Sequence, residues 1–253
     1  MTGYYRPSSL AEAATFLGGG GDVACLAGGH TLIPAMKSRL RAPDALVDLA
    51  HVPGLSGISR EGDRVWIGAM TCHADVAKAA PIPALARLAG GIGDPQVRER
   101  GTLGGSVANN DPAADYPAAV LALDAVIETN RGTHAAGDFF LGMFTTALED
   151  AEIITRIGFR VPQGAAYAKF AHPASRYALV GVFVARFAEG TRVTVTGAGP
   201  GVFRWTDAEV ALDTGGALPA LAPDNLNSDI HAGAEYRAHL AGVMLRRALG
   251  DMA

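Results

Sequence analysis

The chain has 253 residues, of which 49% are hydrophobic and 18% are charged, as expected for a folded globular protein and not for a disordered one. The formal net charge of −4 offers no basic surface for nucleic acid. The two cysteines, Cys25 and Cys72, exclude a disulfide framework and a four-thiolate iron–sulfur site, and they favour a reducing compartment. The N-terminal residues do not resemble a secretory signal and the longest apolar run is too short to span a membrane, so we expect a cytoplasmic protein.

The first fifty residues predict a β–α–β unit. Ser9 and Glu12 have the spacing of a capping box, which predicts that a helix begins at this point. Short apolar runs at residues 23–27 and 45–49 predict buried strands. Between them, residues 31–40 predict a helix that tolerates its proline in the first turn.

A second unit is expected downstream. Residues 64–70 predict a strand, and Thr71 is expected to cap the helix that follows it. Residues 93–117 are rich in the turn formers Gly, Pro, Asn and Asp, so we expect an irregular loop, and ordered loops of this length are usually functional. A helix over residues 118–126 and a strand through Ile127 complete this unit.

The last third of the chain has a different pattern. Alternating apolar residues predict three strands of an antiparallel sheet, at residues 165–171, 177–187 and 192–199. An amphipathic helix is expected over residues 234–249. Its predicted apolar face contains Tyr236, Leu240, Val243, Met244 and Ala248.

Four segments are rich in glycine, and two of them have the context of an anion site. Residues 18–22 end a helix and residues 197–201 precede no helix, so both predict simple turns. Residues 27–31 lie between a strand and a helix, and their two glycines allow backbone N–H groups to approach an anion closely. Residues 101–106 offer a second loop of the same chemistry, with two hydroxyl groups. No lysine is placed as in a P-loop, so nucleoside triphosphate hydrolysis is not expected.

Two further polar residues have a spacing that needs interpretation. His73 and Asp75 could be drawn as a metal-binding pair. We interpret them instead as the solvated start of a helix, with an acidic residue near its N-terminus. No HExxH motif, CxxC motif or nucleophile elbow occurs in the sequence.

The two glycine loops, taken together, match the pattern of a known protein family. Residues 27–55 and 96–125 together resemble the FAD-binding subunit of the molybdenum hydroxylases, the family of the xanthine dehydrogenase and carbon monoxide dehydrogenase medium subunits. The resemblance extends to residues 4–13, 138–155 and 231–249, and so covers essentially the whole chain. The paired glycine motifs that carry it are highly specific.

The resemblance implies an α+β fold and a domain division. A two-subdomain FAD-binding domain of the vanillyl-alcohol-oxidase (PCMH) type is expected over residues 1–163, with subdomains of about 1–55 and 56–163. A smaller α+β domain of the carbon monoxide dehydrogenase flavoprotein type is expected over residues 164–253. This is not a doubly wound dinucleotide-binding fold.

The resemblance also implies a site in which the two glycine loops hold the FAD diphosphate from two sides. Asp115 matches an acidic residue that binds the cofactor, although capping of the next helix is an alternative. Ile92 and Ile154 match apolar positions beside the cofactor, with core packing as an equal alternative. Lys169 matches a lysine near the flavin and Tyr177 is a candidate to stack on its ring, with a surface salt bridge and strand packing as the respective alternatives.

The predicted cofactor-binding residues are therefore Leu26, Ala27, Gly28, Gly29, His30, Thr31, Leu32, Ile33, Ile92, Gly101, Thr102, Leu103, Gly104, Gly105, Ser106, Asp115, Ile154, Lys169 and Tyr177. No catalytic residue and no metal-binding residue is expected in this chain. By resemblance, FAD performs the redox chemistry and the protein positions it.

The resemblance further implies partners. A large subunit with a molybdopterin cofactor would oxidise the substrate, and a small subunit with 2Fe–2S clusters would pass the electrons to FAD and an external acceptor. A dimer of such heterotrimers is expected. A self-sufficient FAD oxidoreductase, a flavin-retaining assembly module and a nucleotide-binding regulator stay open as alternatives. The sequence names neither the substrate nor the acceptor, which could be oxygen, NAD or a quinone.

Overall fold

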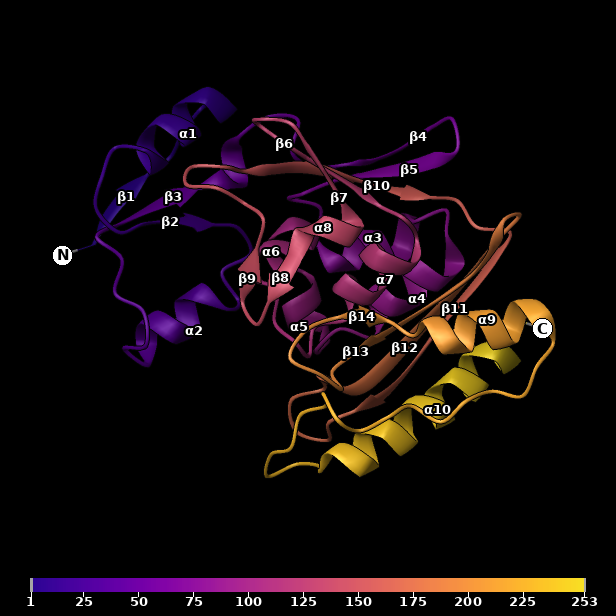
Figure 1. Ribbon diagram of the computed structural model, residues 1–253. Helices are drawn as coiled ribbons and strands as arrows, with labels where there is room; N and C mark the ends of the chain where they lie inside the picture. Colours follow the sequence, from indigo (N-terminus) through magenta and orange to yellow (C-terminus); the bar gives the residue numbers. More distant parts are fainter. Residues whose placement is uncertain (1, 253) are drawn as a thin grey trace.

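The N-terminal part of the protein is a small parallel sheet with two helices. The structure, a computed structural model, describes residues 2–252. The sheet has the strand order β1-β3-β2 (Figure 1, indigo). Its elements are β1 (Gly3–Tyr5), α1 (Leu10–Leu17), β2 (Val23–Leu26), α2 (Leu32–Lys37), β3 (Ala45–Asp48) and the 3₁₀ helix η1 (Leu49–His51).

The capping box predicted for α1 is confirmed in its first half. The Ser9 side chain accepts a hydrogen bond from the backbone N–H of Glu12, at 3.2 Å. The Glu12 carboxylate, however, accepts from the backbone N–H and the hydroxyl of Ser8, one residue before the expected donor. Strand β1 is not predicted from the sequence, because three residues show too little alternation to be recognised.

The central part is a five-stranded antiparallel sheet with several short helices against it. The strand order is β4-β5-β10-β6-β7. The strands are β4 (Ile58–Glu61), β5 (Arg64–Gly68), β6 (Val126–Thr129), β7 (Thr133–Ala135) and β10 (Ile154–Arg160). The helices are α3 (His73–Ala79), α4 (Pro83–Gly90), α5 (Pro95–Arg98), α6 (Leu103–Asn109), α7 (Tyr116–Ala122) and α8 (Ala136–Phe139), and a hairpin of β8 (Phe140–Gly142) and β9 (Thr145–Thr146) follows α8.

Two sequence-based expectations for this part are wrong. The irregular loop expected over residues 93–117 contains α5 and α6, because Asp94 and Thr102 cap them through bonds to the N–H groups of Val97 and Gly105. Thr71 does not cap α3, whose N-cap residue is Cys72. The Thr71 hydroxyl instead bonds to the backbone of Gly57.

The C-terminal part is a four-stranded antiparallel sheet covered by two helices, and the three strands predicted there are confirmed. The sheet consists of β11 (Gly164–Ala171), β12 (Ala178–Phe187), β13 (Gly190–Thr196) and β14 (Phe203–Arg204), and the helices are α9 (Thr206–Thr214) and α10 (Ala234–Asp251). Residues 197–201 form a turn followed by no helix, as expected.

The apolar face predicted for the terminal helix is partly wrong. Leu240, Met244 and Ala248 are buried, but Tyr236 is 48% exposed. The buried face includes Arg237 instead, since its guanidinium donates to two backbone carbonyls of the sheet. None of the helices within residues 2–252 combines the length and apolar character that a membrane crossing requires.

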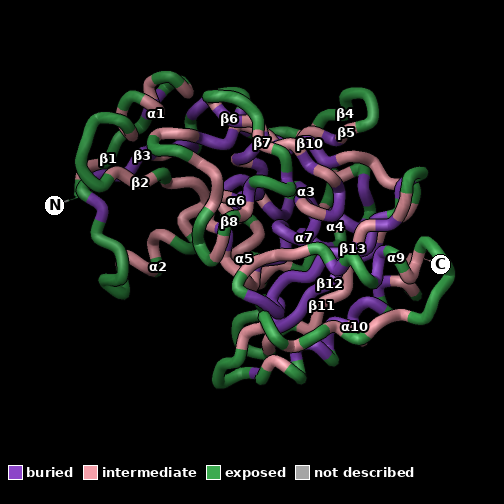
Figure 2. Tube along the Cα trace, viewed as in Figure 1, coloured by how far each residue is buried: buried purple, intermediate pink, exposed green. Residues whose placement is uncertain are grey.

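Strand β12 joins the central and C-terminal parts because both of its faces are buried. Phe183 and Phe187 belong to the core that contains α4 and α7, whereas Val182 and Val184 belong to the core beneath α10. Figure 2 shows β12 and β13 as buried segments between α7 and α10. The two parts therefore share hydrophobic packing and should unfold together.

Removing the Phe183 ring should test this shared packing. Phe183 is fully buried, so Phe183→Ala should lower the free energy of unfolding by about 3–5 kcal/mol. Arg186→Ala changes an exposed residue of the same strand and should cost less than about 0.5 kcal/mol. Urea unfolding followed by circular dichroism measures both, and equal costs for the two variants would contradict the shared core.

Candidate functional site

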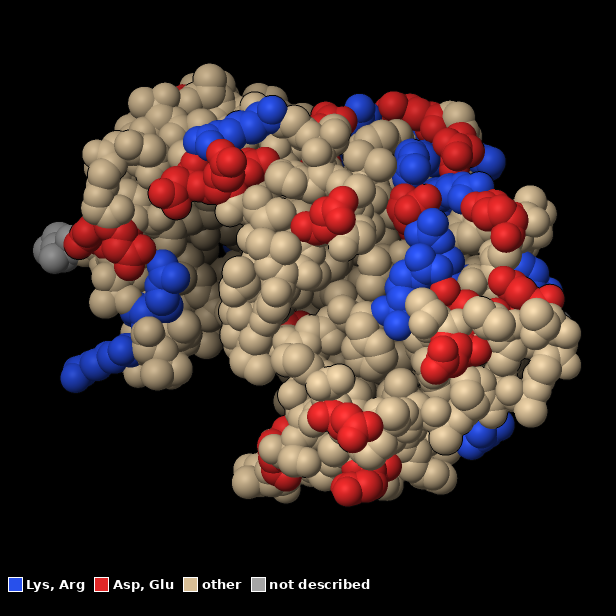
Figure 3. Space-filling view, viewed as in Figure 1, with Lys and Arg blue, Asp and Glu red and all other residues tan. Residues whose placement is uncertain are grey.

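A cleft of about 610 Å³ separates the N-terminal sheet from the central and C-terminal parts. Figure 3 shows the molecular surface hollowed between the N-terminal lobe and the rest of the molecule. Its volume falls within the range of small-molecule and cofactor sites. The predicted site residues that line it are Ala27, Gly28, Gly29, His30, Thr31, Leu32, Ile92, Gly101, Thr102, Gly104, Gly105, Ser106, Asp115, Ile154 and Tyr177.

Four predicted site residues lie behind the cleft wall instead of in it: Leu26, Ile33, Leu103 and Lys169. Leu26 and Ile33 pack beneath Gly29, where a Cβ would lie 3.3 Å and 3.1 Å from their side chains. Leu103 is fully buried in the central core. Leu26, Ile33 and Leu103 therefore support the cleft wall from behind, and Lys169 bonds to Asp115, a residue of that wall.

The two glycine segments lie directly against each other at the base of the cleft. A Cβ on Gly28 would lie 2.2 Å from the carbonyl oxygen of Arg100 and 2.8 Å from the Cα of Gly101. A Cβ on Gly105 would lie 3.4 Å from the Cβ of Ala27. Gly28 is therefore required by the contact between the two segments, and any side chain there would force their backbones apart.

The first segment has free hydrogen-bond donors. Within residues 2–252, the backbone N–H groups of Gly28, Gly29, His30 and Thr31 make no hydrogen bond to the chain. Gly29 has a φ of +75°, which side-chain-bearing residues rarely adopt. Four consecutive free donors at a turn form a concave anion-binding surface.

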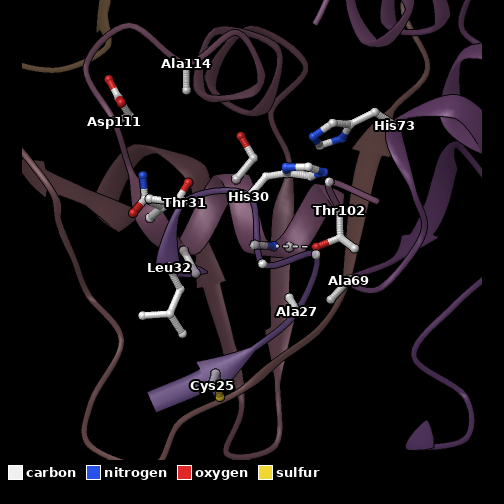
Figure 4. Close-up of a pocket in the computed structure, with 18 of the residues that line it drawn as sticks. Cys25, Ala27, His30, Thr31, Leu32, Ala69, His73, Thr102, Asp111 and Ala114 are labelled. Carbon is white, nitrogen blue, oxygen red and sulfur yellow. Dashed lines mark hydrogen bonds between the residues drawn. The ribbon is translucent and has the colours of Figure 1, made fainter. Parts of the chain in front are cut away.

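The second segment differs from the first, contrary to the expectation of equal chemistry. The N–H groups of Leu103 and Gly104 donate to the carbonyls of Thr71 and Ala69, at 3.1 Å and 2.8 Å. The N–H of Gly105 donates to the Thr102 hydroxyl, a bond drawn in Figure 4. These three N–H groups are therefore already used, and the second segment packs closely against the first.

Asp115 stands in the cleft wall at the centre of a buried polar cluster. Its carboxylate accepts hydrogen bonds from the Tyr167 hydroxyl and from Lys169 Nζ, the latter at 3.0 Å. Lys169 Nζ also donates to the carbonyl of Gly91, at 2.9 Å. Burial raises the pKa of Asp115, while the neighbouring ammonium and phenol oppose this rise. Asp115 does occupy the N-cap position of α7, as the alternative expected, but its side chain makes no capping bond to that helix.

The apolar and aromatic candidates also reach the cleft. Ile92, two residues after the end of α4, and Ile154 of β10 both line it. Tyr177 is 45% exposed and precedes β12, so the alternative that it packs within a strand is wrong. The structure therefore brings these side chains to one cavity from three distant parts of the chain.

Several cleft residues are missed by the sequence analysis, and Asp111 is the clearest. It lies four residues before Asp115, inside the motif that carries the family resemblance, and that spacing could have identified it. Burial raises the pKa of Asp111. Figure 4 shows its carboxylate on the side of the cleft opposite Thr102. The other missed polar residues, besides His73, are Arg41, Asn109, Glu152, Ser175 and Arg176.

The sequence suggested that His73 belongs to a solvated helix start. His73 does begin α3, but it is buried. Its side chain is 4% exposed, lines the cleft and lies beside the His30 ring in Figure 4. Its ring centroid is 5.3 Å from that of Tyr116, and its Nδ1 has no hydrogen-bond partner within the described chain. No cluster of three or more His, Cys, Asp or Glu side chains suited to a metal ion occurs within residues 2–252.

The burial of His73 predicts a pH-dependent stability. Burial lowers the pKa of His73 from 6.5 to about 4, so between these values the unfolded chain binds a proton that the folded chain excludes. This residue should therefore make the protein about 2 kcal/mol less stable at pH 5 than at pH 7. His73→Phe keeps a ring but removes the titration, so its pH dependence should be smaller by that amount. Urea unfolding at pH 5 and pH 7 measures the free energy of unfolding of both proteins. The same difference between the two pH values in His73→Phe and in the wild type would contradict the prediction.

Comparison with known proteins supports the interpretation of this cleft as a cofactor site. Residues 1–163 match the family model described as the FAD binding domain in molybdopterin dehydrogenase. The chain is 36% identical to the carbon monoxide dehydrogenase medium chain of Hydrogenophaga pseudoflava, over 97% of this chain and 95% of that protein. It is 35% identical to the nicotine 6-hydroxylase medium subunit of Paenarthrobacter nicotinovorans, with the same coverage of each chain.

Solved structures show the same fold over nearly the whole chain. The reconstituted CO dehydrogenase from Oligotropha carboxidovorans superposes with a TM-score of 0.91 at 36% identity, covering 100% of this chain and 97% of that one. The quinoline 2-oxidoreductase from Pseudomonas putida 86 superposes with a TM-score of 0.89 at 28% identity, covering 100% and 96%. These matches confirm the α+β fold class and the family resemblance expected from the sequence. The chain belongs to the family of FAD-binding medium subunits of the molybdenum hydroxylases.

Proposed function

We propose that this chain is the FAD-carrying electron-transfer subunit of a molybdopterin-dependent hydroxylase or dehydrogenase. The observation that carries the proposal is the row of free N–H donors at residues 28–31, which faces a cleft of cofactor size. Family membership identifies FAD as the anion-bearing ligand that such donors would hold. The residues present therefore fit the cofactor.

Different cleft residues would bind different parts of the cofactor. The N–H groups of residues 28–31 would bind the diphosphate, and residues 101–106 would hold that turn in place. Asp111 and Asp115 would accept hydrogen bonds from hydroxyl or N–H groups of the cofactor. Tyr177 would cover an aromatic ring at the mouth of the cleft. Leu26, Ile33, Leu103 and Lys169 would act from behind the wall.

When bound, FAD supplies a redox carrier between the 2Fe–2S clusters of a small subunit and an external acceptor. The protein side chains need no acid or base chemistry for this role. They bind, orient and shield the cofactor from water. In this division, residues 1–163 form the FAD-binding domain, and residues 164–253 form a C-terminal domain that contributes Tyr177 and the Asp115 partners.

We also propose that the chain assembles with a large molybdopterin subunit and a small 2Fe–2S subunit, as a dimer of heterotrimers in the cytoplasm. Relatives of similar length are named medium chains and medium subunits. The β8–β9 hairpin leaves Leu141, Met143 and Phe144 more than half exposed. Apolar side chains grouped on a hairpin support a protein contact at this place.

Adding one methyl group at the contact between the glycine segments should impair cofactor binding. The Cβ in Gly28→Ala would lie 2.2 Å from the Arg100 carbonyl oxygen, so the segments must separate at a cost of about 1–3 kcal/mol. Gly137→Ala is the matched control, because no atom lies within 4 Å of its Cβ position. Gly28→Ala should lose most of its FAD after gel filtration, and Gly137→Ala should keep it. Full flavin content in Gly28→Ala would contradict the binding model.

The electron-transfer role predicts a dependence on partner subunits. The chain alone, loaded with FAD, should show no turnover of organic substrates, and the flavin should bleach when the complete complex receives its substrate without an acceptor. Visible absorption spectroscopy measures both results. Turnover by the chain alone would indicate a self-sufficient FAD oxidoreductase. Flavin that stays oxidised in an active complex would exclude electron transfer through this subunit.

A further inference from the structure

The turn between β11 and β12, residues 172–177, reaches the cleft from the C-terminal part of the chain. Three of its residues line the cleft: Ser175, Arg176 and Tyr177. The backbone N–H groups of His172 and Arg176 close the turn, on the carbonyls of Tyr177 and His172, each at 2.8 Å. Arg176 has a φ of +62°, so the turn is held in a backbone conformation that few residues adopt freely.

The ring of His172 fixes this turn through one nitrogen. Its Nδ1 accepts the backbone N–H groups of Ala174 and Ser175, at 3.2 Å and 3.3 Å. A nitrogen that accepts N–H groups carries no proton, so the ring proton is on Nε2. His172 Nε2 lies 3.2 Å from Nδ1 of His231. With this tautomer, Nε2 of His172 donates to Nδ1 of His231.

His231 is itself anchored to the C-terminal helix. Its backbone N–H donates to Asp229 Oδ1, at 2.8 Å, and Asp229 Oδ2 accepts from Arg237 Nη2, at 2.7 Å. Arg237 is buried on α10 and also donates to the carbonyls of Leu179 and Gly197. A continuous path of hydrogen bonds therefore runs from a buried arginine to the turn at the cleft.

We propose that His172 and His231 form a clasp that positions Arg176 and Tyr177 over the cofactor cleft. Loss of the Nδ1 acceptor of either ring would release the turn. That the ligand of this cleft is FAD rests on the function proposed above.

The charged groups around the clasp do not substitute for the missing acceptor. Asp229 bonds to the backbone of His231 and to Arg237, and to neither imidazole ring.

Limited proteolysis of the full chain without FAD tests the clasp directly. Trypsin cleaves after Arg176, which is exposed on the turn. His231→Ala removes the acceptor and should speed this cleavage about fivefold at pH 8, as expected for one lost hydrogen bond. His231→Asn places an amide oxygen at the position of Nδ1 and should restore the slow rate. His239→Ala changes another exposed histidine, on α10, and should match the wild type. An unchanged rate in His231→Ala would overturn the proposal.

The release rate of FAD, followed by flavin fluorescence after dilution, tests whether the clasp holds the turn over the cleft. His231→Ala should release FAD several-fold faster than the wild type, and His231→Asn should restore the slow rate. Equal release rates in the wild type and in His231→Ala would overturn the clasp. If the wild-type chain bound no FAD, the proposed function would fail, and the proteolysis result would still decide whether the clasp exists.

Discussion

Backbone packs directly on backbone where Gly28 meets Arg100 and Gly101, and the geometry of the cleft depends on this contact. The N-terminal sheet and the central sheet are separate sheets, although the N-terminal core also contains Ile153 and contacts Met70 of the central part. Their distance at the base of the cleft is set by the absence of one Cβ. A cofactor that spans both needs its two binding segments at a fixed separation, because donors displaced by even 1 Å lose much of their hydrogen-bond energy.

The contact also explains why two similar glycine motifs have different tasks. The N–H groups of Leu103 and Gly104 are consumed by carbonyls of the strand-to-helix connection near Thr71. This makes the second segment rigid and part of the central core. The first segment leaves its N–H donors free, and it packs directly against the second. The first motif therefore keeps backbone donors of the kind that Leu103, Gly104 and Gly105 have already used.

Structural features that depend on residues close together in the sequence can be predicted from it. Features that depend on contacts with distant residues cannot. The Ser9 cap and the three C-terminal strands follow from local pattern, and both are confirmed. The helices within residues 93–117 depend on the caps of Asp94 and Thr102, and the turn-forming composition of this segment obscures these local signals. His73 could not be predicted as buried, because its surroundings come from segments on both sides of it in the chain.

The cleft is lined by residues from both sides of residue 163, where the family match ends. Tyr177 lies in its wall, and Asp115 depends on Tyr167 and Lys169 for its only two side-chain partners within the described chain. Since β12 is buried on both faces, the C-terminal sheet cannot leave without exposing the core that positions α7. A chain ending at residue 163 would retain the free donors but lose the partners of Asp115. The complete cleft therefore needs residues of the C-terminal sheet as well as residues 1–163.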